Sequence, residues 1–152
     1  MKTVAVLDPG VVEIIDTPIP KPKSYQALVK TKVACICNNT DSELVAGHFP
    51  GMENSFPFAL GHESIGEVVE IGSEVRNFRV GQKAVSGLVF DDELNADGIS
   101  SGWGGFCEYV LVNDHERMVE NSVDNEENGW VEVFEIQTPV INSIEYEDGV
   151  LL

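Results

Sequence analysis

The chain has few basic residues, and this scarcity excludes several partner classes. Nine lysines and arginines stand against 26 acidic residues, which gives a formal net charge of −17. From position 84 onward, sixteen acidic residues accompany a single basic one, Arg117. Such a surface repels phosphate backbones and anionic lipid. We therefore expect neither nucleic acid nor a membrane surface as a partner.

Long apolar runs and cysteines are also scarce. The apolar start of the chain ends at Leu7, too early for a signal-peptide core, and no later run approaches the length of a membrane span. Two of the three cysteines lie in Cys35-Ile36-Cys37, and an odd number leaves one thiol over in any disulfide scheme. Cysteines of this kind suit a reducing compartment, so we expect a cytoplasmic protein.

Segments with the length and period of long helices are missing as well. Fourteen glycines and seven prolines interrupt the chain, and the short segments between them are rich in Val and Ile, which predicts strands joined by turns. Good N-cap residues before Ser42–Ala46, with Gly47 after it, predict one short helix. At 152 residues we expect one mostly β domain, a small barrel or sandwich. The expected strands are Thr3–Leu7, Val11–Thr17, Ala27–Ala34, Glu63–Ile71, Lys83–Leu88 and Phe106–Val112.

A dinucleotide-binding fingerprint is absent. No Gly-x-Gly-x-x-Gly follows a strand and opens a helix, and Gly102-Trp103-Gly104-Gly105 has the wrong spacing. The acidic run Glu120–Asn128 has almost no apolar residue and predicts a solvated loop. Gly129–Ile136 alternates again, which predicts an extra strand, so a hairpin is expected within about 113–139.

Four motifs occur in a fixed order. Ala34–Asp41 reads Ala-Cys-Ile-Cys-Asn-Asn-Thr-Asp, and Gly61-His62-Glu63 opens an apolar run that ends at Gly72. Asn77–Ala84 follows, and then Gly104–Tyr109, which reads Gly-Gly-Phe-Cys-Glu-Tyr. From about Thr3 to Val112 the chain resembles the N-terminal GroES-like catalytic domain of zinc-dependent medium-chain alcohol dehydrogenases.

The resemblance implies a fold, an activity and two cofactors. The fold is a partly open β-barrel with one or two short helices over residues 1–152, and the nucleotide-binding Rossmann domain lies outside this chain. The activity is hydride transfer between an alcohol or polyol, or the corresponding carbonyl compound, and NAD or NADP bound by that other domain. The isolated chain is then inactive, and the full-length protein is a homo-oligomer. One catalytic zinc is implied, because the family's cysteine-rich structural zinc lobe is missing between Lys83 and Phe106.

Cys37 and His62 match the family's first two zinc ligands. A buried free thiol and a core histidine are the alternative interpretations. The family places Asp three residues after the ligand cysteine, whereas Asp41 is four after Cys37, so either the loop holds one extra residue or Asn38 occupies the ligand position. We expect the extra residue. The resemblance places the third ligand immediately after Leu152, so the chain is expected to end just before its zinc site is complete.

Three further residues match family positions with catalytic roles. The resemblance implies that Asp41 orients the ligand histidine, that Glu63 lies close to the metal, and that Thr40 bonds the substrate oxygen and begins a proton relay. Helix capping or solvation would also explain each of them. His48 could continue the relay, although surface exposure is favoured.

Two cysteines remain. Cys35 shares a strand face with Cys37 and is a reserve ligand, with core packing favoured. Cys107 is expected in the core.

Two other functions remain as alternatives. A zinc-free relative of the quinone reductase type would typically lack both Cys37 and the Gly-His-Glu motif. A non-enzymatic GroES-like binding module, such as a co-chaperonin, would have no reason to hold Cys, His and Glu together.

Overall fold

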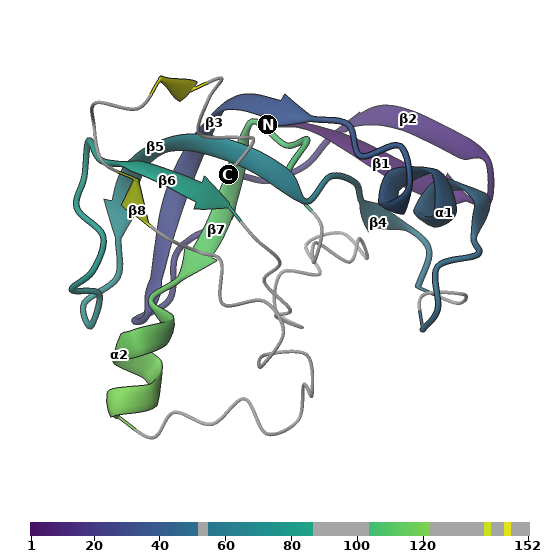
Figure 1. Cartoon of the computed structure of the whole chain (residues 1–152). Helices are drawn as coiled ribbons and strands as arrows, with labels where there is room; N and C mark the ends of the chain where they lie inside the picture. Colours follow the sequence, from purple (N-terminus) through teal and green to yellow (C-terminus); the bar gives the residue numbers. More distant parts are fainter. Residues whose placement is uncertain (52–54, 87–103, 122–138, 141–144, 147–152) are drawn as a thin grey trace.

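The computed structural model describes residues 1–51, 55–86, 104–121, 139–140 and 145–146, and it folds them into two antiparallel sheets and two short helices (Figure 1). The three-stranded sheet has the order β2-β1-β4, and the five-stranded sheet has the order β7-β3-β5-β6-β8. The helices are α1, Thr40–Ala46, and α2, His115–Glu120. The strands are β1, Lys2–Asp8; β2, Val11–Asp16; β3, Gln26–Cys35; β4, Phe58–Ala59; β5, Glu63–Ile71; β6, Lys83–Ser86; β7, Tyr109–Asn113; and β8, Pro139–Val140.

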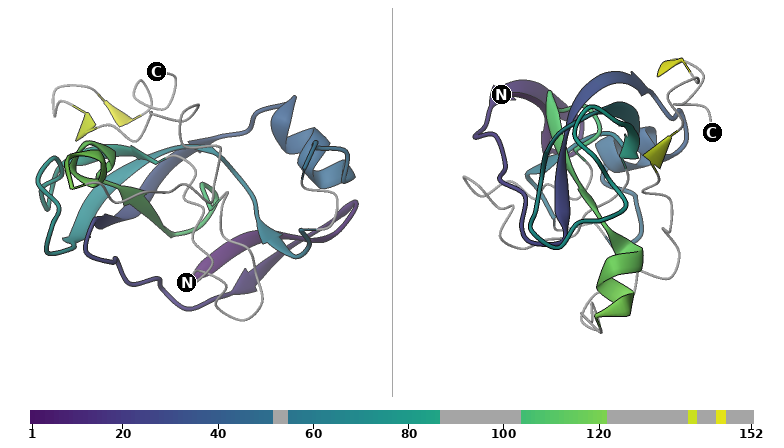
Figure 2. Two further views of the ribbon diagram at one scale, coloured as in Figure 1. Left: turned by 90° about the horizontal axis from the view of Figure 1, so that it is seen from below. Right: turned by 90° about the vertical axis from the view of Figure 1, so that its left-hand side faces the viewer.

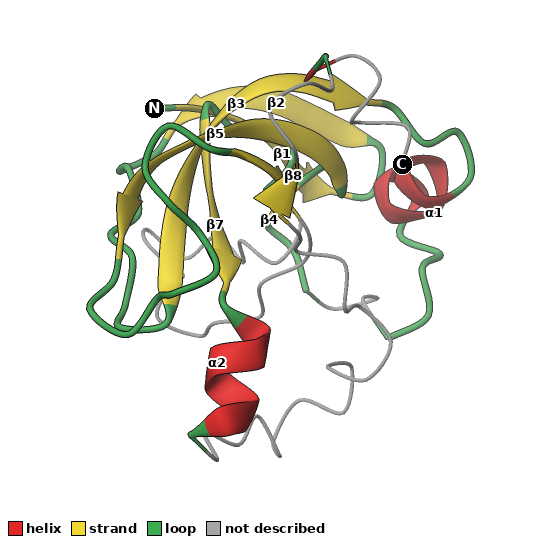
Figure 3. Ribbon diagram, turned by 60° about the vertical axis from the view of Figure 1, so that its left-hand side comes forward, coloured by secondary structure: helices red, strands yellow, loops and turns green. Residues whose placement is uncertain are grey.

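The mostly β prediction is confirmed, and the sheets are open rather than closed into a barrel. Figures 2 and 3 show the five-stranded sheet curving away from β1 and β2, with α1 at one side of the molecule and α2 beyond the end of β7. The strand predicted at Lys83–Leu88 is β6, and its last two residues lie outside the described residues. The predicted extra strand at Gly129–Ile136 also lies outside them, as does the acidic loop from position 122.

The prediction of a strand from Phe106 onward was wrong in its start. Cys107 N–H donates to the Gly104 carbonyl at 3.0 Å, which closes a turn, and β7 begins only at Tyr109. The Phe106 N–H donates to the Leu60 carbonyl at 3.0 Å instead of to a neighbouring strand of the five-stranded sheet. Helix α2 and the two-residue strand β4 were not predicted.

Strand β3 is the centre of the larger sheet. It pairs with β7 on one side and with β5 on the other, and its first four residues, Gln26–Val29, are buried on both faces. Burial alternates along β3 only from Lys30 onward. Before that point residues of β5 and β7 pack on Ala27 and Val29, while Leu28 packs in a second cluster on the opposite face.

A separate apolar cluster holds α1 against the smaller sheet. Leu44 of α1 is buried with Val6 of β1, Phe58 of β4 and Leu60, and Phe106 packs against this cluster. The helix ends at Gly47, whose φ of 74° is the left-handed conformation that glycine adopts at helix C-termini. The predicted helix is thus present, and it begins at Thr40.

A buried carboxylate joins β7 and α2 to the loop after β5. Asp114 is 1% exposed and accepts hydrogen bonds from the backbone N–H groups of Arg76, Asn77 and Arg117 and from the Asn77 side chain. Burial alone would raise the pKa of Asp114, but the bonds from Asn77 and Arg76 outweigh it and hold the pKa below the usual aspartate range. The charged form is therefore the one that the fold stabilises.

Replacing this carboxylate is expected to destabilise the domain. Asp114→Ala leaves buried N–H donors without an acceptor, so we expect the free energy of unfolding to fall by about 2–4 kcal/mol in urea titrations at neutral pH. Because the folded-state pKa lies below the unfolded-state value, the contribution is fully present above the unfolded-state pKa and is lost as pH falls through the folded-state pKa. The difference between the two proteins should therefore shrink on acidification.

Asp16→Ala is the control for this prediction. Asp16 pairs with Lys2 at 2.7 Å, but both side chains are mostly exposed, so no measurable change in stability is expected. Equal losses in the two variants, or a difference that does not vary with pH, would contradict the role of Asp114.

Candidate metal centre

Strand pairing brings two distant motifs together. In the antiparallel register of β3 and β5, Cys35 lies opposite Glu63. Cys37 is two residues past that pair on one chain segment, and His62 is one residue before it on the other. One ligand atom from each of Cys37, His62 and Glu63 lies within 4.8 Å of the other two. We call these three side chains the donor cluster.

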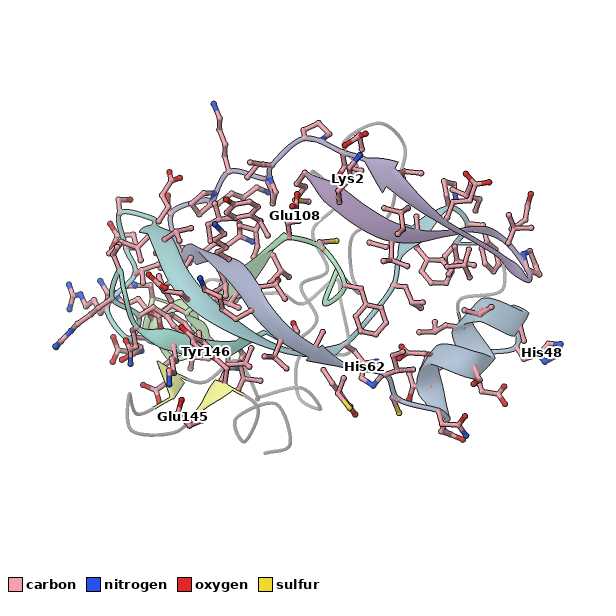
Figure 4. The ribbon with its side chains drawn as sticks, turned by 90° about the horizontal axis from the view of Figure 1, so that it is seen from above. Lys2, His48, His62, Glu108, Glu145 and Tyr146 are labelled. Carbon is pink, nitrogen blue, oxygen red and sulfur yellow. The ribbon has the colours of Figure 1, made fainter. Side chains whose placement is uncertain are left out.

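Asp41 of α1 connects two members of the donor cluster. Its Oδ1 lies 3.3 Å from His62 Nδ1, and its Oδ2 accepts a hydrogen bond from the Cys37 backbone N–H at 2.8 Å. The Asp41 side chain is buried, and Figure 4 shows His62 between the sheet and α1. A carboxylate at Nδ1 favours the tautomer with the proton on that nitrogen. The lone pair of Nε2 can then bind a metal ion.

The turn before α1 joins Cys37 to Asp41, the part of the motif in which an extra residue was expected. The Asp41 N–H donates to the Cys37 carbonyl at 3.0 Å, a contact across four residues that brings the carboxylate back over the cysteine. The helix N-cap is Asn39, which has an αR backbone and no side-chain capping bond. Cys37 contributes to the donor cluster, whereas Asn38 is exposed. This arrangement supports the choice of Cys37 over Asn38, and the extra residue stays a prediction.

Glu63 lies beside His62 and Cys37, as its expected place close to the metal requires. Its Oε1 is 3.6 Å from His62 Nε2, and the carboxylate is one of the three donors of the cluster. The sequence analysis gave it only a place near the metal, because the family's third ligand was expected after Leu152. The pairing with Cys35 could have signalled its position, since it follows from the strand register.

The other candidates lie outside the donor cluster. Thr40 is partly exposed at the start of α1, and its side chain makes no hydrogen bond within the described residues. His48 is exposed at the opposite end of α1 from His62 (Figure 4). Cys35 is not in the cluster, and among the described residues its thiol makes only a long contact of 3.9 Å to the Ile36 carbonyl.

Cys107 lies in the core. It is 5% exposed, and burial raises the pKa of its thiol to about 11, although a hydrogen bond with Thr3 opposes the rise. Its thiol is therefore protonated at neutral pH and has no part in the donor cluster.

The donor cluster fits zinc. Thiolate, imidazole and carboxylate are the three ligand types that zinc takes in proteins. Bonds of about 2.0–2.3 Å in a tetrahedron place ligand atoms roughly 3.3–3.8 Å apart. The atoms here all lie within 4.8 Å of one another, so small side-chain rotations suffice. Three protein ligands leave a fourth position for water or substrate, which is the composition of a catalytic site.

Comparison with known proteins identifies the family. The family model for the alcohol dehydrogenase GroES-like domain matches residues 23–122. The chain belongs to this family. An alcohol dehydrogenase from Cupriavidus necator is 31% identical to this GroES-like domain over 109 residues, which are 70% of the chain and 29% of that enzyme. The match thus covers less than a third of the length of this curated relative.

Solved structures of dehydrogenases and oxidoreductases match the fold of this chain. A Sinorhizobium meliloti protein assigned as a zinc-binding dehydrogenase, bound to NADP, matches with a TM-score of 0.61 and 32% identity over 75% of this chain and 36% of its own. A quinone oxidoreductase from Coxiella burnetii matches with a TM-score of 0.69 over 100% of this chain and 40% of its own, but at 22% identity that likeness shows the fold alone. Neither described helix has the length and apolar character needed to cross a bilayer.

Neutralising the carboxylate beside His62 is expected to weaken metal binding. Asp41→Asn keeps the size of the side chain but removes the charge that supports His62 Nδ1, so affinity for Zn²⁺ or Co²⁺ should fall by about 10–100-fold. Competition with a chromophoric chelator measures this affinity.

Glu43→Gln is the matched control, because Glu43 lies on the same helix, is exposed, and loses the same charge. It should bind metal like the original chain. A similar loss in both variants would show that only the overall charge of α1 matters.

Proposed function

We propose that this chain is the catalytic domain, residues 1–152, of a zinc-dependent oxidoreductase that transfers hydride between an alcohol or polyol and NAD or NADP. The observation that carries the proposal is the donor cluster, with Asp41 bonded to the loop of one member and in contact with the ring of another. Family membership supports the reaction class. The nicotinamide cofactor would be bound by a nucleotide-binding domain outside these residues, so this chain alone should not turn over substrate.

Each side chain at the site would have its own role. Cys37, His62 and Glu63 would hold the ion, and Asp41 would keep the His62 ring in place with its proton on Nδ1. A zinc ion bound there would polarise the alcohol or carbonyl oxygen and lower the pKa of the alcohol. The Cys37 N–H bond to Asp41 fixes the loop, so that the thiolate and imidazole approach from fixed directions.

Thr40 is proposed as the residue whose hydroxyl bonds the substrate oxygen and begins the proton relay. It would accept the proton of the substrate hydroxyl as its own proton passes to solvent water. Thr40 directly precedes Asp41 in the sequence. Its side chain is partly exposed and makes no hydrogen bond within the described part of the chain. It is therefore available to a bound substrate. His48 is not included in this relay, because it lies at the far end of α1 (Figure 4).

The zinc-free quinone-reductase alternative is less well supported. Its support is a fold likeness at 22% identity. It gives no reason for a cysteine, a histidine and a glutamate to converge beside a buried aspartate. The same objection applies to a non-enzymatic binding module. A cytoplasmic, homo-oligomeric protein remains part of the proposal.

Metal binding is the first test. The chain should bind one equivalent of Zn²⁺ or Co²⁺, and the cobalt form should show a thiolate charge-transfer band because Cys37 is a ligand. His62→Ala should abolish binding, and Cys37→Ser should remove the band, while the circular dichroism spectrum stays unchanged.

His48→Ala and Cys35→Ser are the matched controls, since neither residue lies in the donor cluster. Both should keep one equivalent of metal and the band. Unchanged metal content in His62→Ala would overturn the ligand assignment and favour the binding-module alternative.

The role of Thr40 is tested in the full-length gene product with primary and secondary alcohols, diols and both nicotinamide cofactors. Thr40→Ala should lower kcat by about 10²–10⁴-fold if the hydroxyl transfers the proton, and Thr40→Ser should restore most of it. Ser42→Ala, an exposed hydroxyl on the same helix, is the control. A loss in Thr40→Ala that serine does not restore would indicate a packing role.

A further inference from the structure

We infer that the 104–107 turn is a positioning element for His62, and that Gly105 and Phe106 fix the backbone from which the imidazole reaches the metal. The inference rests on the proposed function for the metal, but the contacts that support it are present in the metal-free chain. This turn lies more than forty residues after the histidine, and the sequence analysis used it only as a family motif.

Two consecutive N–H groups of the turn bind two consecutive carbonyls before His62. The Phe106 N–H donates to the Leu60 carbonyl at 3.0 Å, and the Gly105 N–H donates to the Gly61 carbonyl at 2.9 Å. Leu60 also donates its own N–H to the Val4 carbonyl at 2.9 Å. The segment that leads into His62 is therefore bonded to both the turn and β1.

Gly61 and Gly105 are required because the turn and the segment before His62 lie so close together. A Cβ on Gly105 would lie 2.8 Å from the Gly61 carbonyl carbon and 3.0 Å from the His62 nitrogen. A Cβ on Gly61 would lie 2.6 Å from the Phe106 ring, and Gly61 has a φ of 96°, which is unfavourable for any residue with a side chain. The turn thus touches the backbone of His62 itself.

Phe106 also connects this turn to the helix that carries Asp41. Its side chain packs against the apolar cluster that contains Leu44, three residues after Asp41 on α1, and Leu60, two residues before His62. The segments that carry Asp41 and His62 therefore both contribute a side chain to the cluster against which this ring packs. Displacing the ring should change the distance between the carboxylate and the imidazole.

The experiment compares two variants of the turn with two variants elsewhere. Gly105→Ala inserts a methyl group against His62, and Phe106→Leu removes the ring while keeping an apolar side chain. Gly81→Ala is the glycine control, since Gly81 has a φ of 84° and would be strained, but it lies in the turn before β6. Phe78→Leu is the aromatic control, because Phe78 is buried in the other large cluster.

Two readouts are recorded for each variant. The first is the NMR signal of the His62 ring in the metal-free chain, assigned by its loss in His62→Ala. The second is the affinity for Co²⁺. Both turn variants should shift the His62 ring signal and weaken Co²⁺ binding by about 10-fold or more, as changes around ligating histidines do. The two controls should lower the melting temperature but leave both readouts unchanged.

Three outcomes decide whether the 104–107 turn positions His62. Shifts and weaker binding confined to the turn variants support the inference. Turn variants that lose thermal stability like the controls, with both readouts unchanged, overturn it and leave the turn a purely structural contact. If the original chain binds no Co²⁺, the proposed function fails, and the ring signal alone then decides whether the turn positions His62.

Discussion

The antiparallel pairing of β3 with β5 is the constraint on which the rest of the structure depends. It occupies the middle of the larger sheet, and its last pair sets Cys35 opposite Glu63. A shift of one residue would turn every β5 side chain to the other face and separate the donor atoms. The register is fixed away from the site, where Val29 and Val68 are buried in the apolar cluster that also holds Phe78. Core packing at one end of the strands thus determines the donor geometry at the other.

Two buried carboxylates serve different purposes at the two ends of this sheet. Asp114 accepts hydrogen bonds from three backbone N–H groups and one side-chain amide, so all these partners lie within the protein. Asp41 accepts one backbone bond and directs its second oxygen at His62. A carboxylate whose bonds are all made within the fold stabilises that fold, whereas one that faces an imidazole can orient a ligand. Similar burial therefore does not imply a similar role.

Sequence alone predicted the local features of this chain and missed those that depend on long-range contact. The β3 and β5 strands and the short helix before Gly47 came from composition and pattern. The expectation that Cys37 and His62 lie together came from the family resemblance. The start of β7 was wrong because Phe106 gives its N–H to Leu60, a partner 46 residues away that no local pattern reveals. The place of Glu63 as one of the three members of the donor cluster, beyond lying close to the metal, was not predicted, because it follows from the strand register.

The burial of Cys107 has a practical consequence for chemical labelling. Thiol reagents attack the thiolate, and a thiol whose pKa is about 11 presents almost none at neutral pH. An alkylating reagent added to the native domain should therefore leave Cys107 unmodified and react at Cys35 and Cys37, which are both partly exposed. Mass spectrometry of the labelled protein would then separate occupied from empty centres molecule by molecule, because a coordinated Cys37 would be protected while Cys35 would not.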